Sequence, residues 1–161
     1  MKDEFVLKER KILLIEDDPD HADLILNIFE MEDVGKEVIL MQDGQDVIDY
    51  LQEVDTSNQI VQSDVEGGNG RRSQIDLVIL DLNLPKINGM DVLKFLKGSS
   101  KYSSIPVVIL STSSDQNTIS EAYKNGANCY ITKPMSYDEF VDKIKMLKRY
   151  LSGTNTLPPQ A

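Results

Sequence analysis

Five short apolar runs, separated by segments of helical character, constrain the fold of this chain more than any other feature. Each run is rich in Ile, Val and Leu and contains no alternating polar residues, as in strands buried on both faces of a sheet. Amphipathic segments between such strands are typical of parallel α/β construction. The runs are 12–15, 38–41, 77–80, 105–110 and 129–131. We therefore predict a flavodoxin-like (βα)5 fold, a doubly wound five-stranded parallel sheet flanked by five helices.

The ends of the helical segments carry recognisable signals. Asp18-Pro19 opens the first helix, because Asp is a good N-cap and proline suits the first helical position, and Gly35 closes this segment. Leu24, Ile28 and Met31 share one stripe that we expect to face the sheet. Gly126 follows the fourth predicted helix as a C-terminal glycine should. The remaining helices are predicted over 45–52, 88–97, 115–125 and 136–151.

Length and local composition predict one domain with an extension at each end and one internal insertion. A chain of 161 residues with 40% apolar content is long enough for one complete core, which we place at 11–151. Residues 1–10 and 152–161 are expected to be extensions, and the ten residues of the tail leave no room for an output domain. Residues 53–74 are too long for an ordinary helix-to-strand connection, so we interpret them as a mobile surface insertion.

Charge and cysteine content limit the partners and the compartment. The net charge of -10 disfavours binding to nucleic acid or to anionic membranes. A lone cysteine, Cys129, cannot form an internal disulfide and is expected in the core. No apolar stretch resembles a signal peptide or reaches the length of a membrane span. We expect a soluble cytoplasmic protein.

Polar residues directly follow four of the five apolar runs, where parallel sheets usually bind ligands. The first, third and fourth strands can be neighbours, which brings Glu16, Asp17 and Asp81 into one crevice. Two carboxylates about 4 Å apart repel by roughly 4 kcal/mol at an effective dielectric near 20, so a cation is expected. Magnesium suits oxygen ligands of this kind. The residues after the runs are Glu16-Asp17-Asp18, Asp81-Leu82-Asn83, Ser111-Thr112 and Thr132-Lys133-Pro134.

The same crevice should also contain an ammonium group, from Lys133, and a hydroxyl donor, from Ser111. A carboxylate beside a divalent cation, an ammonium and a hydroxyl is suited to receive a phosphoryl group. Asp81 stands alone at its strand end, which makes it the best candidate nucleophile. Glu16 and Asp17 are adjacent and better placed to hold the ion.

Four segments in order now resemble a known family, the receiver domains of response regulators. Each segment follows a predicted strand, and the resemblance covers about residues 11–151. The segments are Ile-Glu-Asp-Asp-Pro at 15–19, Leu-Asp-Leu-Asn-Leu-Pro-Lys-Ile-Asn-Gly at 80–89, Ile-Pro-Val-Val-Ile-Leu-Ser-Thr at 105–112 and Tyr-Ile-Thr-Lys-Pro at 130–134.

This resemblance implies roles for the site residues. Asp81 would accept a phosphoryl group from a histidine kinase in a magnesium-dependent reaction, with Mn²⁺ or Ca²⁺ able to substitute in vitro. Asp17 would bind the metal directly, Glu16 would assist through water, and Asn83 would offer its backbone carbonyl. Such a protein is a signalling switch and no enzyme beyond its own phosphorylation and dephosphorylation.

The resemblance also implies how a switch would work and what it would contact. Lys133 would pair with the phosphoryl oxygens, Ser111 would move toward them, and Tyr130 would change rotamer. The expected partners are a histidine kinase, a downstream or phosphotransfer protein, and a second copy of the chain. The long insertion, the Leu-Asn-Leu-Pro-Lys run and the tail around Thr156 to Pro159 are similar to response regulators paired with cyanobacterial and bacterial phytochromes.

Three other functions share parts of this pattern. A magnesium phosphatase resembling haloacid dehalogenases also uses an aspartyl phosphate, but it has a second Asp where this chain has Asn83. A flavodoxin-like cofactor binder would need a phosphate loop after the first strand. A degenerate receiver that only binds partners is disfavoured by the intact acidic, hydroxyl and lysine positions.

Several residues have plainer interpretations. Asp18 is expected to cap a helix more than to bind metal, and His21 to be a surface residue. A cis bond before Pro134 would direct Lys133 into the crevice. Met146 and Tyr150 are expected outside the buried stripe of the last helix, either as scattered surface residues or as a dimer face. That stripe is Tyr137, Phe140, Val141, Ile144, Leu147 and Leu151.

Overall fold

The sheet contains five parallel strands in the order β2-β1-β3-β4-β5. The computed structural model describes residues 9–53, 75–133 and 136–151. Every neighbouring pair is parallel, and β1 lies between β2 and β3, as expected for a doubly wound sheet. The predicted fold class is confirmed. The strands are β1 (Lys11–Ile15), β2 (Glu37–Met41), β3 (Leu77–Asp81), β4 (Val107–Ser111) and β5 (Cys129–Thr132).

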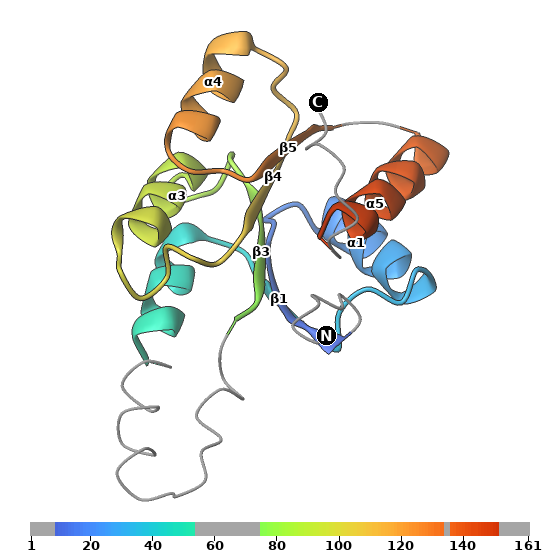
Figure 1. Cartoon of the computed structure of the whole chain (residues 1–161), viewed down its shortest axis with the longest axis horizontal. Coiled ribbons are helices and arrows are strands. Elements are labelled where there is room, and N and C mark those ends of the chain that lie inside the picture. The colour runs from blue at the N-terminus through green and yellow to red at the C-terminus, as the bar shows by residue number, and fades with distance from the viewer. Residues whose placement is uncertain (1–8, 54–74, 134–135, 152–161) are drawn as a thin grey trace, which may run out of the picture.

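Helices cover both faces of the sheet (Figure 1). One layer is formed by α1 (Pro19–Met31) and α5 (Tyr137–Leu151). The opposite layer is formed by α3 (Gly89–Gly98), α4 (Gln116–Lys124) and a helix over 44–53 that reaches the edge of the described residues. None of the described helices combines the length and apolar character that crossing a membrane requires.

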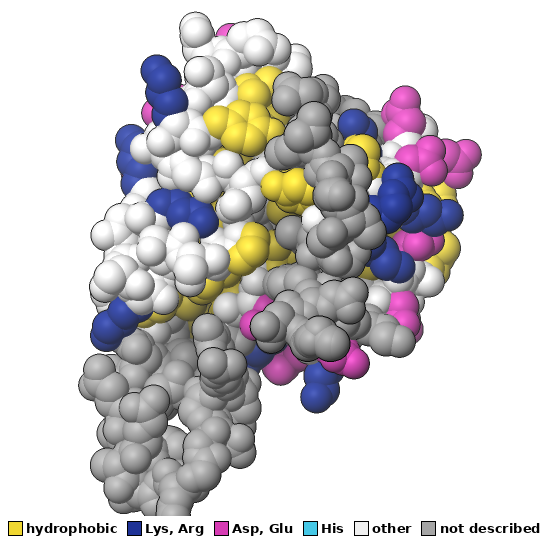
Figure 2. Space-filling view, viewed as in Figure 1, with side chains coloured by type: hydrophobic (Ala, Val, Ile, Leu, Met, Phe, Trp, Pro, Cys, Tyr) yellow, Lys and Arg dark blue, Asp and Glu magenta, His cyan; other side chains and the backbone are white. Residues whose placement is uncertain are grey.

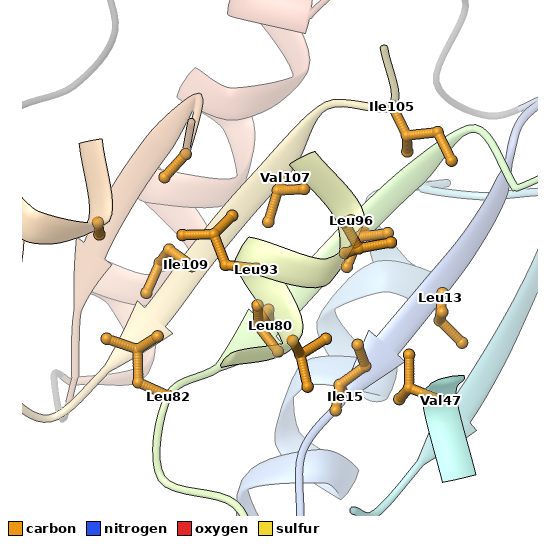
Figure 3. Packing of buried hydrophobic residues seen from close by; sticks show 14 of the residues in the cluster. Leu13, Ile15, Val47, Leu80, Leu82, Leu93, Leu96, Ile105, Val107 and Ile109 are labelled. Carbon is orange, nitrogen blue, oxygen red and sulfur yellow. The ribbon is translucent and has the colours of Figure 1, made fainter. Parts of the chain in front are cut away.

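Two apolar clusters fill the space between the sheet and its helices, one on each face. β3 and β4 are buried along their whole length, which explains why their sequences have no polar alternation. Figure 3 shows the cluster beneath α3, where alternate strand residues such as Leu80 and Ile109 meet Leu93 and Leu96. The cluster on the other face joins the strands to α1 and α5. The carboxyl ends of the strands are thereby held on a rigid support.

The helix ends follow the predicted capping signals. The Asp18 side chain accepts from the backbone N–H groups of Asp20 and His21, so it is the N-cap of α1. Asn88 and Asp115 cap α3 and α4 in the same way. Gly126 has φ +104°, a conformation that favours glycine after a helix.

Three details of the predicted helices and strands are wrong. In α1 the buried face is Ala22, Ile25, Ile28 and Phe29, and Met31 is 62% exposed. The fourth strand begins two residues later than predicted. Pro106 has no N–H to donate to a sheet, and the Ile105 N–H donates to the Tyr102 carbonyl.

The third correction concerns α5. Phe140, Ile144 and Leu147 are buried as expected, but Tyr137 is 44% exposed and lies outside the core. Tyr150, predicted on the outer flank, packs against the core cluster. The predicted stripe is therefore correct from Phe140 to Leu147 and wrong at Tyr137, and the buried face also includes part of Tyr150. This removes one of the two residues on which the predicted dimer face depended.

Some predictions fall outside the described residues. These are the extension up to residue 8, most of the insertion (54–74), the Pro134 bond and the tail (152–161). On the described surface, Lys and Arg side chains lie close to Asp and Glu side chains over α1 and α5 (Figure 2). The face in that view therefore carries mixed charge.

Candidate phosphoryl-acceptor site

The ends of four strands bring the predicted site residues together. The β-sheet register pairs Ile15 with Leu80 and Ser111 with Thr132, so the residues that follow lie side by side. Among the described residues, four polar or charged residues are buried, and all four are predicted site residues. They are Glu16, Asp81, Ser111 and Lys133. Burial of charge is costly unless the groups are paired or bind a cation, so this concentration points to a functional site.

Three carboxylates form an acidic cluster at this edge. Carboxylate oxygens of Glu16, Asp17 and Asp81 all lie within 4.8 Å of one another. Glu16 and Asp81 are buried, whereas Asp17 is exposed. The pKa of Asp81 is raised to about 6, chiefly by burial and also by the neighbouring Glu16 carboxylate, against the opposing effects of the Asn83 N–H and of Lys133. Oxygen ligands at this spacing fit a hard divalent cation, which would relieve the repulsion.

One buried ammonium opposes this negative charge. Lys133 Nζ lies 2.7 Å from Glu16 Oε1 and 3.6 Å from Asp81 Oδ2. The Lys133 N–H donates to the Ser111 carbonyl at 2.6 Å, which continues the sheet and fixes the lysine backbone. Lys133 therefore links the ion-binding side of the cluster to the candidate nucleophile.

The backbone after β3 holds Asp81 in place. The Asn83 N–H donates to Asp81 Oδ1 at 3.0 Å, and the Gly89 N–H donates to the Leu82 carbonyl at 2.9 Å. A Cβ on Gly89 would lie 2.3 Å from the Asp81 carbonyl oxygen, so only glycine fits there. The first turn of α3 thus packs directly on the residues that carry the nucleophile. That the Asn83 carbonyl binds metal stays a prediction.

Ser111 and Tyr130 connect to the loop after β4. Ser111 Oγ accepts from the Ser113 N–H at 3.1 Å. The fully buried Tyr130 donates its hydroxyl proton to the Ser113 carbonyl at 2.7 Å. A movement of Ser111 would therefore act on the same loop that Tyr130 contacts.

His21 is the site residue that sequence reasoning missed. Its Nδ1 lies 3.2 Å from Lys133 Nζ, 3.7 Å from Asp18 Oδ2 and 3.9 Å from Glu16 Oε2. His21 was predicted to be a surface residue. This is wrong for the Nδ1 side of its ring, which faces the site. A signal existed: His21 lies on the first turn of α1, a few residues after Glu16, at the edge where the strands end.

Comparisons with known proteins agree with this geometry. The family model for the response regulator receiver domain matches residues 12–145. The probable methanogenesis regulatory protein FilR2 of Methanothrix harundinacea is 35% identical over 150 residues, which cover 93% of this chain and 88% of that protein.

Two solved structures extend the comparison. The crystal structure of the phosphorylated cyanobacterial phytochrome response regulator RcpA has a TM-score of 0.73 at 34% identity and covers 94% of this chain and 99% of its own. The Mn²⁺-bound form of the response regulator Rcp1, a protein of Synechocystis, has a TM-score of 0.71 at 28% identity. The match covers 93% of this chain and 99% of the Rcp1 chain. The fold, the acidic cluster and these matches together show that the chain belongs to the response-regulator receiver family of two-component signalling proteins.

Proposed function

We propose that Asp81 accepts a phosphoryl group from a histidine kinase in a reaction that requires magnesium. One observation carries the proposal: the buried Asp81 carboxylate belongs to the acidic cluster and lies 3.6 Å from the Lys133 ammonium. With a divalent cation held by the cluster, positive charge would lie on both sides of Asp81 and would stabilise the oxygens of a phosphoryl group transferred to it.

The transfer exchanges one bond for another. A carboxylate oxygen of Asp81 forms a bond to phosphorus while the phosphorus–nitrogen bond of the donor phosphohistidine breaks and nitrogen keeps the electron pair. Lys133 would move from Glu16 toward the new phosphoryl oxygens, a short shift because its Nζ lies 2.7 Å from Glu16 Oε1 and 3.6 Å from Asp81 Oδ2. Hydrolysis of the aspartyl phosphate later returns the resting state.

Magnesium fits the donor set, because three carboxylates with a single ammonium leave excess negative charge. When bound, it would supply positive charge to the carboxylates and to the transferred oxygens. Asp17 and Asp81 would hold it directly, Glu16 through water, and Asn83 through its carbonyl. Mn²⁺ and Ca²⁺ would substitute in vitro.

Phosphorylation would then change the conformation of the loop after β4. Ser111 donates to a phosphoryl oxygen, which disturbs its bond with the Ser113 N–H. The Ser113 carbonyl accepts from Tyr130, so that ring loses its fixed partner and can change rotamer. The surface near α4 and β5 is thereby altered for a downstream protein.

The relatives support a proposal for the partners. RcpA is a phytochrome response regulator, so we propose a phytochrome as the histidine kinase and a downstream or phosphotransfer protein as the target. Self-association through α5 now depends on Met146, which is half-buried. No nucleic acid or membrane partner is proposed, and the cytoplasmic location inferred from composition stays a prediction.

Incubation with acetyl phosphate and magnesium, followed by intact mass measurement, tests the proposal. The wild-type chain should gain the mass of one phosphoryl group, and Asp81→Asn should gain none. Asp142→Asn, at an exposed position on α5, is the matched control and should be labelled normally. Labelling of Asp81→Asn would refute the assignment. Catalytic turnover of small phosphate esters would instead favour the phosphatase.

A further inference from the structure

Three side chains, two carboxylates and one imidazole, surround the Lys133 ammonium. It has three N–H donors and no acceptor of its own. Glu16 Oε1 lies 2.7 Å away, His21 Nδ1 3.2 Å and Asp81 Oδ2 3.6 Å. Lys133 is 5% exposed, so water does not readily replace any of them. The two carboxylates have other proposed roles, in metal binding and in phosphoryl acceptance. The third group is the His21 imidazole.

His21 is well fixed for this contact. Its backbone N–H donates to Asp18 Oδ1 at 3.3 Å, which places the residue on the first turn of α1. Its ring is half-buried, with Nδ1 directed at Lys133. An ammonium can only donate, so the bond requires that Nδ1 carries no proton and that the ring proton is on Nε2.

In the proposed function the other two partners of Lys133 change at the moment of transfer. Phosphorylation converts the Asp81 carboxylate into an acyl phosphate, whose phosphoryl oxygens become the new partners of the ammonium. Glu16 would then assist in holding the metal. A neutral imidazole nitrogen is a poor ligand for a hard cation such as magnesium, so His21 stays available to Lys133.

We propose that His21 is a positioning residue, whose Nδ1 holds the Lys133 ammonium beside Asp81 before and during phosphoryl transfer. It touches neither the phosphoryl group nor Asp81 and acts only through Lys133. This inference rests on the proposed function, but the contact itself exists in the metal-free, unphosphorylated protein and can be measured there.

The first measurement uses the metal-free full chain. NMR of protein labelled with ¹⁵N-lysine gives the rate at which the Lys133 ammonium protons exchange with water, with the signal assigned by Lys133→Arg. His21→Leu should accelerate exchange about tenfold, the effect of losing one hydrogen bond to a charged group. His21→Asn places an amide oxygen near the Nδ1 position and should restore slow exchange. Asp23→Leu, an exposed position on α1, is the control and should change nothing.

The second measurement is the rate of labelling by acetyl phosphate at saturating magnesium. His21→Leu should be labelled about tenfold more slowly, and His21→Asn at close to the wild-type rate. Thermal unfolding of each variant shows that it is folded. Unchanged exchange, unchanged labelling, or failure of His21→Asn to restore both would overturn the inference. If the wild type takes no label at all, the proposed function fails, and that result does not depend on any His21 variant.

Discussion

Asp81→Asn should make the metal-free protein more stable at neutral pH. The pKa of Asp81 is raised from 3.8 to about 6 in the folded protein, chiefly by burial. A carboxyl whose pKa is raised by folding binds its proton more tightly in the folded state, so ionisation destabilises that state. The difference of about two pKa units, at 1.36 kcal/mol each, gives about 3 kcal/mol as an upper value. Asn removes the charge and keeps an oxygen to accept from the Asn83 N–H.

The raised pKa of Asp81 also predicts how the free energy of unfolding changes with pH. As pH rises from about 4 to about 6, the wild-type free energy of unfolding should fall by this amount, because the unfolded chain releases the proton first. Above that window the penalty is complete, and below about pH 4 both proteins are neutral at this position and should be equally stable. For a chain of this length, 3 kcal/mol corresponds to roughly 6 to 12 °C in melting temperature.

Urea unfolding in EDTA at several pH values is the assay. Asp142→Asn removes one exposed charge from α5 and should stay within about 0.5 kcal/mol of wild type at every pH. Saturating magnesium should reverse the order, because the wild type then gains binding free energy that Asp81→Asn lacks. An Asp81→Asn protein that is no more stable than wild type at pH 7.5 in EDTA would refute the argument that Asp81 is held ionised at a cost.

Three further outcomes are expected. Asp17→Asn should abolish the rise in melting temperature on magnesium titration, whereas Asp18→Ala should keep that rise and lose about 1 kcal/mol of stability with the α1 cap. Gly89→Ala should cost about 1 to 3 kcal/mol in urea unfolding and slow acetyl phosphate labelling, since its Cβ would lie 2.3 Å from the Asp81 carbonyl oxygen. Tyr130→Phe should lose about 1 kcal/mol with its bond to the loop carbonyl and still be labelled at Asp81, as intact mass would show.

The sequence predicted the sheet and most of the site because both depend on local patterns. Unbroken apolar runs mark buried strands, and parallel strands carry their next residues to the same edge, which is why Asp81, Ser111 and Lys133 could be placed together. His21 could not be placed this way. Its contact with Lys133 spans 112 positions and depends on how the first turn of α1 is rotated at that edge.

The remaining errors lie at the ends of two predicted stripes. In α1 the predicted stripe was Leu24, Ile28 and Met31; Ile28 is buried and Leu24 packs against the core, whereas Met31 at the helix end is exposed. In α5 Tyr137 at the first turn is exposed, and Tyr150 near the last turn packs against the core. Periodicity gives the spacing of a stripe, but tertiary packing decides which residues near the helix ends meet a neighbouring element.

The four buried polar residues come from the ends of four different strands, and the ion pair between Lys133 and Glu16 joins positions 117 apart in the chain. No fragment of the sheet contains the whole set, since Lys133 follows β5 and Glu16 follows β1. A chain that has not finished folding therefore has Asp81 without its neighbouring ammonium. Under the proposed function, only fully folded molecules would accept a phosphoryl group.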